Sequence, residues 1–373
     1  MSHIFERTVI NGMVLENRLV RSATWEGMCT GEGRPTEKLV SCYRDLARGG
    51  VGLIVTGYAY VRPDGRQLPG TMGIYTDDFA DEMRHLTDVV HAEGGSIAMQ
   101  LVHTGGKANT AGLDCLPVSP SGIGLASSPG PSVAMTRSDI ESMITAFAAG
   151  AARAKEYGFD AVQLHAAHGY LINQFLSPLT NRRADEYGGS VENRRRFLME
   201  VYAVVRQAVG LHYPVLIKLN VDDFLEGGLI GEEAIEAARR LDAAGMDAIE
   251  VSGGTADSGE RTPARGRAKS PAEEGYHRDL ARRVKAVVSC PVMVVGGFRS
   301  RAVVEETLQS GGADYIAMAR PFIREPDLVA KWRQGGGSPA ACQSCNGCFK
   351  PGLEEGGIYC VKQREKERLH AGD

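Results

Sequence analysis

The chain has 373 residues, of which 43% are hydrophobic and 24% are charged, and its formal net charge is −4. This composition is typical of a soluble folded protein, and the small negative charge provides no general attraction to nucleic acid or to an anionic membrane surface. No apolar run reaches the roughly 18 residues of a membrane span, and the N-terminus lacks the apolar core of a signal peptide. We therefore expect a cytoplasmic protein that binds neither nucleic acid nor membranes.

The first predicted element is a β-hairpin at residues 9–14, VINGMV. Its Asn-Gly pair is the preferred two-residue turn between short strands. We expect this hairpin to close the floor of the fold.

A regular alternation of strands and helices follows. Eight β-branched runs are predicted as strands, at residues 19–23, 52–56, 96–101, 161–164, 215–219, 248–251, 292–295 and 315–318. Helices are expected at 78–93, 137–157, 191–209, 232–244, 276–288 and 301–310, and Gly94, Gly158 and Gly245 stand where left-handed caps are expected. The pattern predicts an α/β fold, a (β/α)8 TIM barrel over residues 1–335, followed by a cysteine-rich tail over residues 336–373.

In such a barrel the active site lies at the C-terminal ends of the strands. Two long connections are expected on that face, at residues 104–136 and 253–275, where lids and substrate-binding segments commonly lie. The second carries Arg261, Arg265, Arg267 and Lys269. It could contact an anionic substrate or a nicotinamide phosphate, although a solvated charged loop is the simpler interpretation.

The fourth predicted strand leads into His165, His168 and Tyr170. Two imidazoles three residues apart can donate hydrogen bonds to one carbonyl or phenolate oxygen, and the phenol can deliver a proton. Two alternatives remain open: structural histidines satisfied by the fold, and a two-His metal site, which would lack a nearby carboxylate ligand.

Polar side chains also interrupt apolar strands. Gln100 can donate and accept hydrogen bonds at the edge of a heterocycle, or can be satisfied by the backbone. Lys218 inside a barrel must meet an anion or hydrogen-bond acceptors. It could be the Schiff-base lysine of an aldolase, a partner of Asp222 or Glu250, or a counter-charge for a reduced cofactor.

The seventh and eighth strands are followed by residues typical of a phosphate site. Gly296 and Gly297 follow the seventh strand, and Ala319 and Arg320 follow the eighth. Barrels commonly bind phosphate with the loops after these two strands.

Four cysteines near the C-terminus form the pattern C-x2-C-x2-C-x11-C, at Cys342, Cys345, Cys348 and Cys360. This spacing favours a 4Fe-4S cluster. The same thiolates could hold one zinc ion, or could carry no metal and cap the C-terminus. The remaining cysteines are scattered singly and are interpreted as small reduced hydrophobic residues.

Several stretches together resemble the old yellow enzyme family of FMN-dependent oxidoreductases over residues 5–328. The stretches are NRLVRSAT at 17–24, QLVH at 100–103, HAAHGYLINQFLSPLTNRRADEYGGSVENRRRF at 165–197 and ADYIAMARPFIREP at 313–326. The cysteine tail extends the similarity to the branch that contains 2,4-dienoyl-CoA reductase, 2-enoate reductase and trimethylamine dehydrogenase, whose barrels carry a four-iron cluster.

The resemblance implies roles for individual residues. His165 and His168 would bind the activating oxygen of the substrate, and Tyr170 would be the proton donor. The FMN contacts would be Ala23, Thr24, Gly57, Gln100, Lys218, Gly297, Ala319 and Arg320. The implied activity is the NAD(P)H-driven reduction of the C=C bond of an α,β-unsaturated carbonyl compound, an enone or an enoyl thioester.

The chain also departs from the family pattern. Lys218 stands where many members have Arg, and Trp25 stands where many place Thr or Cys. No G-x-G-x-x-G motif follows the tail. Either NAD(P)H reduces FMN directly, or a separate electron-donor protein docks near residues 342–360. There are two alternative functions: an oxidative dehydrogenase, and an electron-transfer subunit that serves a partner protein. We also expect the chain to form a homo-oligomer.

Overall fold

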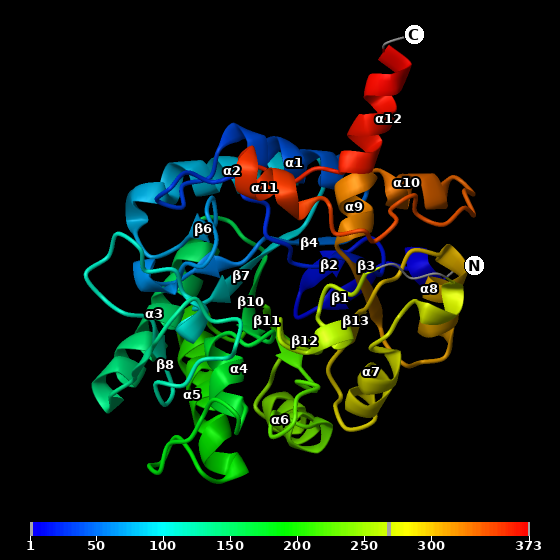
Figure 1. The fold of residues 1–373 in the computed structure, drawn as a ribbon. Helices are drawn as coiled ribbons and strands as arrows, with labels where there is room; N and C mark the ends of the chain where they lie inside the picture. The colour runs from blue at the N-terminus through cyan, green and yellow to red at the C-terminus, as the bar shows by residue number, and fades with distance from the viewer. Residues whose placement is uncertain (1–2, 267–269, 372–373) are drawn as a thin grey trace.

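The computed structural model describes residues 3–266 and 270–371, so Arg267 and Lys269 of the basic loop lie outside the described residues. Eight parallel strands close into a barrel (Figure 1). In order around the barrel these are β3 (Leu19–Arg21), β4 (Leu53–Val55), β7 (Ile97–Val102), β10 (Ala161–Ala166), β11 (Val215–Asn220), β12 (Ala248–Ser252), β13 (Val292–Val295) and β14 (Tyr315–Met318). The barrel closes where Ala317 of β14 pairs with Val20 of β3. The predicted fold class is confirmed.

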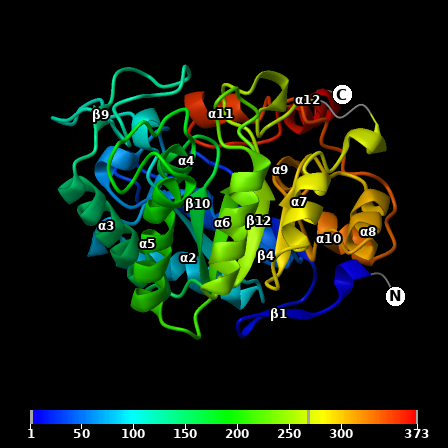
Figure 2. The ribbon, with the colours of Figure 1, turned by 90° about the horizontal axis from the view of Figure 1, so that it is seen from below.

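The N-terminal hairpin is also confirmed. Strands β1 (Thr8–Ile10) and β2 (Met13–Leu15) are antiparallel, with Ile10 opposite Met13. The turn residues Asn11 and Gly12 have φ values of 43° and 84°, as a type I′ turn requires. Ile10, Met13 and Leu15 pack into the cluster of side chains inside the barrel. Figure 2 shows β1 at the end of the barrel opposite α11, so the hairpin closes the floor.

Helices surround the barrel. They are α1 (Glu37–Arg48), α2 (Ala80–Ala92), α3 (Arg137–Glu156), α5 (Val191–Val209), α6 (Gly231–Ala243), α7 (Arg278–Lys285) and α8 (Arg301–Gln309). Gly94, Gly158 and Gly245 have φ values of 75°, 89° and 93°, as expected for left-handed caps. Helix α1 was not predicted, and α7 is shorter than predicted at both ends. Tyr276 and His277 instead belong to the loop before α7.

The other helices and strands of the barrel domain are short. They are β5 (Ala59–Tyr60), β6 (Met72–Gly73), β8 (Val118–Ser119), β9 (Val133–Ala134), α4 (Leu171–Leu176), α9 (Arg320–Arg324), α10 (Leu328–Arg333) and the 3-10 turns η1 (His3–Phe5), η2 (Pro63–Gly65), η3 (Asp77–Phe79), η4 (Gly105–Lys107), η5 (Gly259–Arg261) and η6 (Pro271–Glu273). Within the described ranges no helix has the length and apolar character needed to cross a membrane.

The cysteine-rich tail packs against the loop between β3 and α1. It contains α11 (Phe349–Glu354) and α12 (Val361–Ala371), and α12 projects away from the barrel (Figure 1). Gly352 lies so close to the Trp25 ring that a Cβ atom there would approach it to 2.7 Å. The Ile358 N–H donates to the Glu26 carbonyl oxygen at 2.8 Å. These contacts place the tail next to the loop that follows β3.

Candidate active site

A cavity of about 320 Å³ opens at the C-terminal ends of the barrel strands. The predicted catalytic and cofactor-binding residues that line it are Ala23, Thr24, Gln100, His165, His168, Tyr170, Lys218, Gly297, Ala319 and Arg320. Gly57 is the exception, because its N–H donates to Glu26 Oε1 at 3.1 Å and to the Tyr43 hydroxyl at 3.1 Å. The structure thus brings the predicted site residues together from most of the barrel strands, and Gly57 supports this site from behind.

His165 lies near the end of β10, and His168 lies on the sharp turn that follows this strand. His168 and Gly169 have φ values of 62° and 76°, and the two imidazole centroids lie 5.2 Å apart. His165 Nδ1 accepts a hydrogen bond from the Ala167 N–H at 3.3 Å, while His168 Nε2 lies 2.7 Å from Ser252 Oγ. The second nitrogen of each ring has no hydrogen-bond partner among the described residues. Both rings can therefore donate to one ligand oxygen in the cavity.

The protonation states suit this role. Burial lowers the pKa of His165 and of His168 well below the usual value, and the nearby Lys218 lowers both further. Burial raises the pKa of Tyr170 to about 12, although its neighbour Tyr58 opposes the rise. At neutral pH the site therefore presents two neutral imidazole donors beside a protonated phenol.

The cavity residues that were not predicted include Tyr58, Gln67 and Lys107. The Tyr170 hydroxyl donates to Gln67 Oε1 at 2.8 Å. The Tyr58 ring lies 5.5 Å from the Tyr170 ring, and its buried hydroxyl has no partner among the described residues. Lys107 Nζ donates to the His168 carbonyl oxygen at 3.2 Å. Tyr58 directly follows Gly57, so the rule of looking just after each strand could have found it.

A buried polar network lies at the barrel centre. Lys218 Nζ is 3.1 Å from Glu250 Oε1, with the two side chains 3% and 0% exposed. Ser22 Oγ donates to the same oxygen at 2.6 Å, and Gln163 Nε2 donates to the other at 2.9 Å. Gln100 Nε2 in turn donates to Gln163 Oε1 at 2.7 Å. Of the two carboxylates considered for Lys218, Glu250 is the partner.

The predicted phosphate residues Gly297, Ala319 and Arg320 also line the cavity. Gly297 has φ of 74°, and a Cβ atom there would stand 2.8 Å from the Tyr276 ring, so only glycine fits without strain. Arg320 begins α9 and is buried. A heterocycle between Gln100 and Lys218 with a phosphate near Gly297 and Arg320 fits this donor set, as FMN would.

The four tail cysteines line a second, smaller cavity next to Arg320. Across the described ranges, no three His, Cys, Asp or Glu side chains are arranged to hold a single metal ion. Ser344 and Phe349 of the same segment line the larger cavity, so the tail forms part of its wall.

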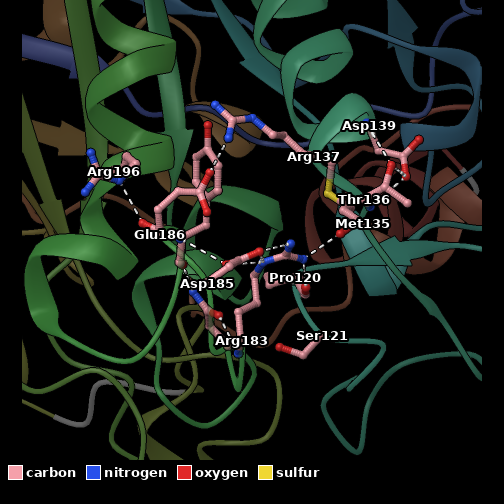
Figure 3. A network of polar contacts seen from close by, with 12 residues as sticks. Pro120, Ser121, Met135, Thr136, Arg137, Asp139, Arg183, Asp185, Glu186 and Arg196 are labelled. Atoms are coloured by element: carbon pink, nitrogen blue, oxygen red, sulfur yellow. Dashed lines mark hydrogen bonds and ion pairs between the residues drawn. The ribbon is translucent and has the colours of Figure 1, made fainter.

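Both long loops reach the active-site face. Ala256, Thr262 and Ala264 of the 253–275 loop line the cavity, and the Arg265 guanidinium lies 4.2 Å from the centre of the Tyr276 ring. The other long loop is held by Arg183 (Figure 3). Its Nη1 donates to the carbonyl oxygens of Pro120 and Met135 at 2.6 and 2.5 Å.

Comparison with known proteins decides the family. The model of the NADH:flavin oxidoreductase / NADH oxidase family matches residues 3–337. The chain belongs to this family. Membership implies FMN and NAD(P)H as cofactors, which agrees with the donor set of the cavity.

The proteins that are similar to this chain differ in length. An NADH oxidase from Thermoanaerobacter brockii is 35% identical over 93% of the chain, and the chain spans 53% of that protein. An NADPH dehydrogenase from Geobacillus sp. strain WCH70 is 36% identical, with 87% of this chain and 91% of that protein covered. A solved structure of 2-naphthoyl-CoA reductase superposes with a TM-score of 0.89 at 30% identity, covering 96% of this chain and 56% of that one. The chain thus corresponds to nearly all of one relative and about half of the others.

Proposed function

We propose that the chain is an NAD(P)H:flavin oxidoreductase that reduces the C=C bond of α,β-unsaturated carbonyl compounds. The observation that carries this proposal is the convergence of His165, His168 and Tyr170 in one cavity with the other predicted cofactor residues. An acid group close to two neutral donors is what the addition of hydride and proton across an activated alkene requires.

The chain's own residues would hold the cofactor. Gln100 and Lys218 would contact the heterocycle, and Gly297 and Arg320 would contact the phosphate. When bound, FMN supplies the hydride that is transferred to the substrate. The positive charge of Lys218 would favour the reduced, anionic cofactor, and Glu250 would temper that charge.

The histidines and the tyrosine act on the substrate. His165 and His168 donate hydrogen bonds to the carbonyl oxygen and stabilise the negative charge that develops there. Tyr170 protonates the α-carbon, and its raised pKa keeps its proton in place until then. Gln67 accepts from the Tyr170 hydroxyl at 2.8 Å and so orients it in the free protein.

The test is Tyr170→Phe, which removes the proton donor but leaves the ring. We expect reduction of a cyclic enone, 2-cyclohexen-1-one, to slow by about 10²- to 10⁴-fold, with flavin reduction by NAD(P)H unchanged, both measured by rapid mixing. Tyr213→Phe is the control, because its buried hydroxyl donates to the Phe159 carbonyl oxygen outside the cavity. Equal slowing of both half-reactions in Tyr170→Phe would remove Tyr170 from this role.

We further propose that Cys342, Cys345, Cys348 and Cys360 bind a 4Fe-4S cluster. The support is their C-x2-C-x2-C-x11-C spacing and their position around one cavity. Assays of iron and acid-labile sulfide on protein purified without oxygen test this. About four irons per chain are expected, and one zinc per chain with no sulfide would refute the cluster.

One alternative function is favoured by a specific contact. Because Phe349 and Ser344 of the tail line the larger cavity, a cluster in the tail would lie near the flavin and could exchange electrons with it. The chain would then be a flavin/iron–sulfur dehydrogenase or a subunit serving a partner protein. Bleaching of the flavin by a reduced substrate without NAD(P)H would favour this alternative.

A further inference from the structure

Arg320 stands where three cavities meet. It lines the large cavity, the groove beside it and the small cavity of the cysteines. Its side chain belongs to α9, but its hydrogen bonds reach two other segments. Nη1 donates to the Arg265 carbonyl oxygen at 2.8 Å, to Asn346 Oδ1 at 2.7 Å and to the Ser344 carbonyl oxygen at 3.2 Å. Two of these three acceptors belong to the loop between the cysteines, which therefore helps to fix the position of this guanidinium.

Asn346 makes the central contact. It lies between Cys345 and Cys348 with φ of 59°, a left-handed conformation that Asn tolerates better than most residues. Its amide bridges two partners, because Oδ1 accepts from Arg320 while Nδ2 donates to the Ala264 carbonyl oxygen at 2.9 Å. One side chain thus ties the cysteine loop, the 253–275 loop and α9 together.

Two nitrogens of Arg320, Nε and Nη2, make no contact with Asn346. All of the hydrogen bonds that Arg320 makes within the described residues come from Nη1. Its Nε and Nη2 are not among the buried side-chain atoms that lack a hydrogen-bond partner. These two nitrogens form one edge of the planar guanidinium fork, the edge that binds a phosphate with two parallel hydrogen bonds. Holding Nη1 on one side presents this edge to an anion.

We propose that Asn346 is a positioning residue for the phosphate of FMN: by fixing Arg320 from the cysteine loop, it makes flavin-phosphate binding depend on the tail. The proposal rests on the FMN contact assigned to Arg320 above. A fixed arginine binds more tightly than a mobile one, because the entropy of ordering its long side chain is already lost before binding. The dependence is reciprocal, so bound FMN also stabilises the cysteine loop.

The experiment compares FMN with riboflavin, which lacks the phosphate. Each flavin is titrated into the flavin-free full chain, and binding is followed by flavin fluorescence. In Asn346→Gly, which keeps the left-handed backbone and removes the amide, we expect FMN to bind about tenfold more weakly and riboflavin to bind as in the parent chain. Gln343→Ala is the matched control, because Gln343 is exposed in the same loop and should leave both affinities unchanged.

A second variant guards against a folding defect. Asn346→Asp also tolerates the left-handed conformation and keeps an acceptor for Arg320, but its carboxylate would neutralise the guanidinium. It should weaken FMN at least as much as Asn346→Gly and leave riboflavin unaffected.

Other results overturn the proposal in distinguishable ways. Equal weakening of FMN and riboflavin would mean that Asn346 serves the fold in general. Unchanged FMN binding in both variants would mean that Arg320 does not need Asn346. If the parent chain binds both flavins equally, Arg320 holds no phosphate. If it binds neither, the proposed flavin function fails as well.

Discussion

Lys218 and Glu250 place opposite charges at the centre of the barrel, where both side chains are almost fully buried. Burying two ions costs desolvation energy, which their attraction and additional hydrogen bonds must offset. Ser22 and Gln163 supply those hydrogen bonds to Glu250. The pair therefore has a net charge near zero, and any positive potential at the cavity depends on Glu250 as well as on Lys218.

This balance predicts the effect of Glu250→Gln. Removing the carboxylate leaves the Lys218 charge uncompensated, which stabilises a reduced, anionic flavin, so we expect the flavin potential to rise by about 30 mV or more, roughly tenfold in the two-electron equilibrium. Spectroscopic titration against a reference dye measures the potential. Ser22→Ala is the control, because it removes a hydrogen bond to Glu250 without changing its charge. A lower potential in Glu250→Gln would show that Glu250 does not offset Lys218.

At the scale of elements, the Arg183 side chain joins the two arms of the 104–136 loop. Arg183 donates to carbonyl oxygens on both arms of this loop and pairs with Asp185 (Figure 3). The same loop begins with η4, whose Lys107 contacts the turn that carries His168. The Arg183 network therefore supports a wall of the cavity from a distance.

We expect Arg183→Gln to loosen this loop. Hydrogen bonds to charged groups contribute about 1.5–3 kcal/mol each, and a glutamine cannot reproduce the forked contacts of arginine. The loop should then be cut faster by a protease, and KM for an enone should rise about tenfold with a smaller effect on kcat. Arg182→Gln is the matched control because the Arg182 side chain is exposed. Equal proteolysis of both variants would show that Arg183 does not hold the loop.

For the whole molecule, the sequence predicts the barrel well because each strand is a short apolar run buried on both faces, as in β7. The site residues near the C-terminal ends of strands were predicted because the positions of these strands were predicted. Gln67, Lys107 and Asn346 could not be predicted, because they reach the site through loops whose paths depend on tertiary contacts. Helix α7 starts later than its apolar pattern indicates, because His277 packs against Phe224 and bonds the Val295 carbonyl oxygen instead.

Several buried histidines, among them His165, His168 and His277, reduce the acid stability of the whole fold. Burial lowers the pKa of His165 and His168 well below the usual value and lowers that of His277 to about 3. Below about pH 6.5 the unfolded chain binds protons at these rings, whereas the folded chain binds them only at a lower pH. Stability is therefore complete above about pH 6.5 and falls as the pH decreases, because the unfolded state gains the protons.

The expected slope approaches about 1.4 kcal/mol per pH unit for each such histidine once the pH lies well below 6.5. Most carboxylates contribute little in this range because their usual pKa values lie near 4, although burial raises the pKa of Asp223. Urea unfolding of the flavin-free chain at pH 7.5, 6.5 and 5.5 measures the slope. His277→Gln should reduce the slope, and His212→Gln, a substitution at an exposed position, is the control. Stability that stays constant down to pH 5.5 would mean that these rings take up protons in the folded state, and the site could then not present the two neutral donors on which the proposed chemistry depends.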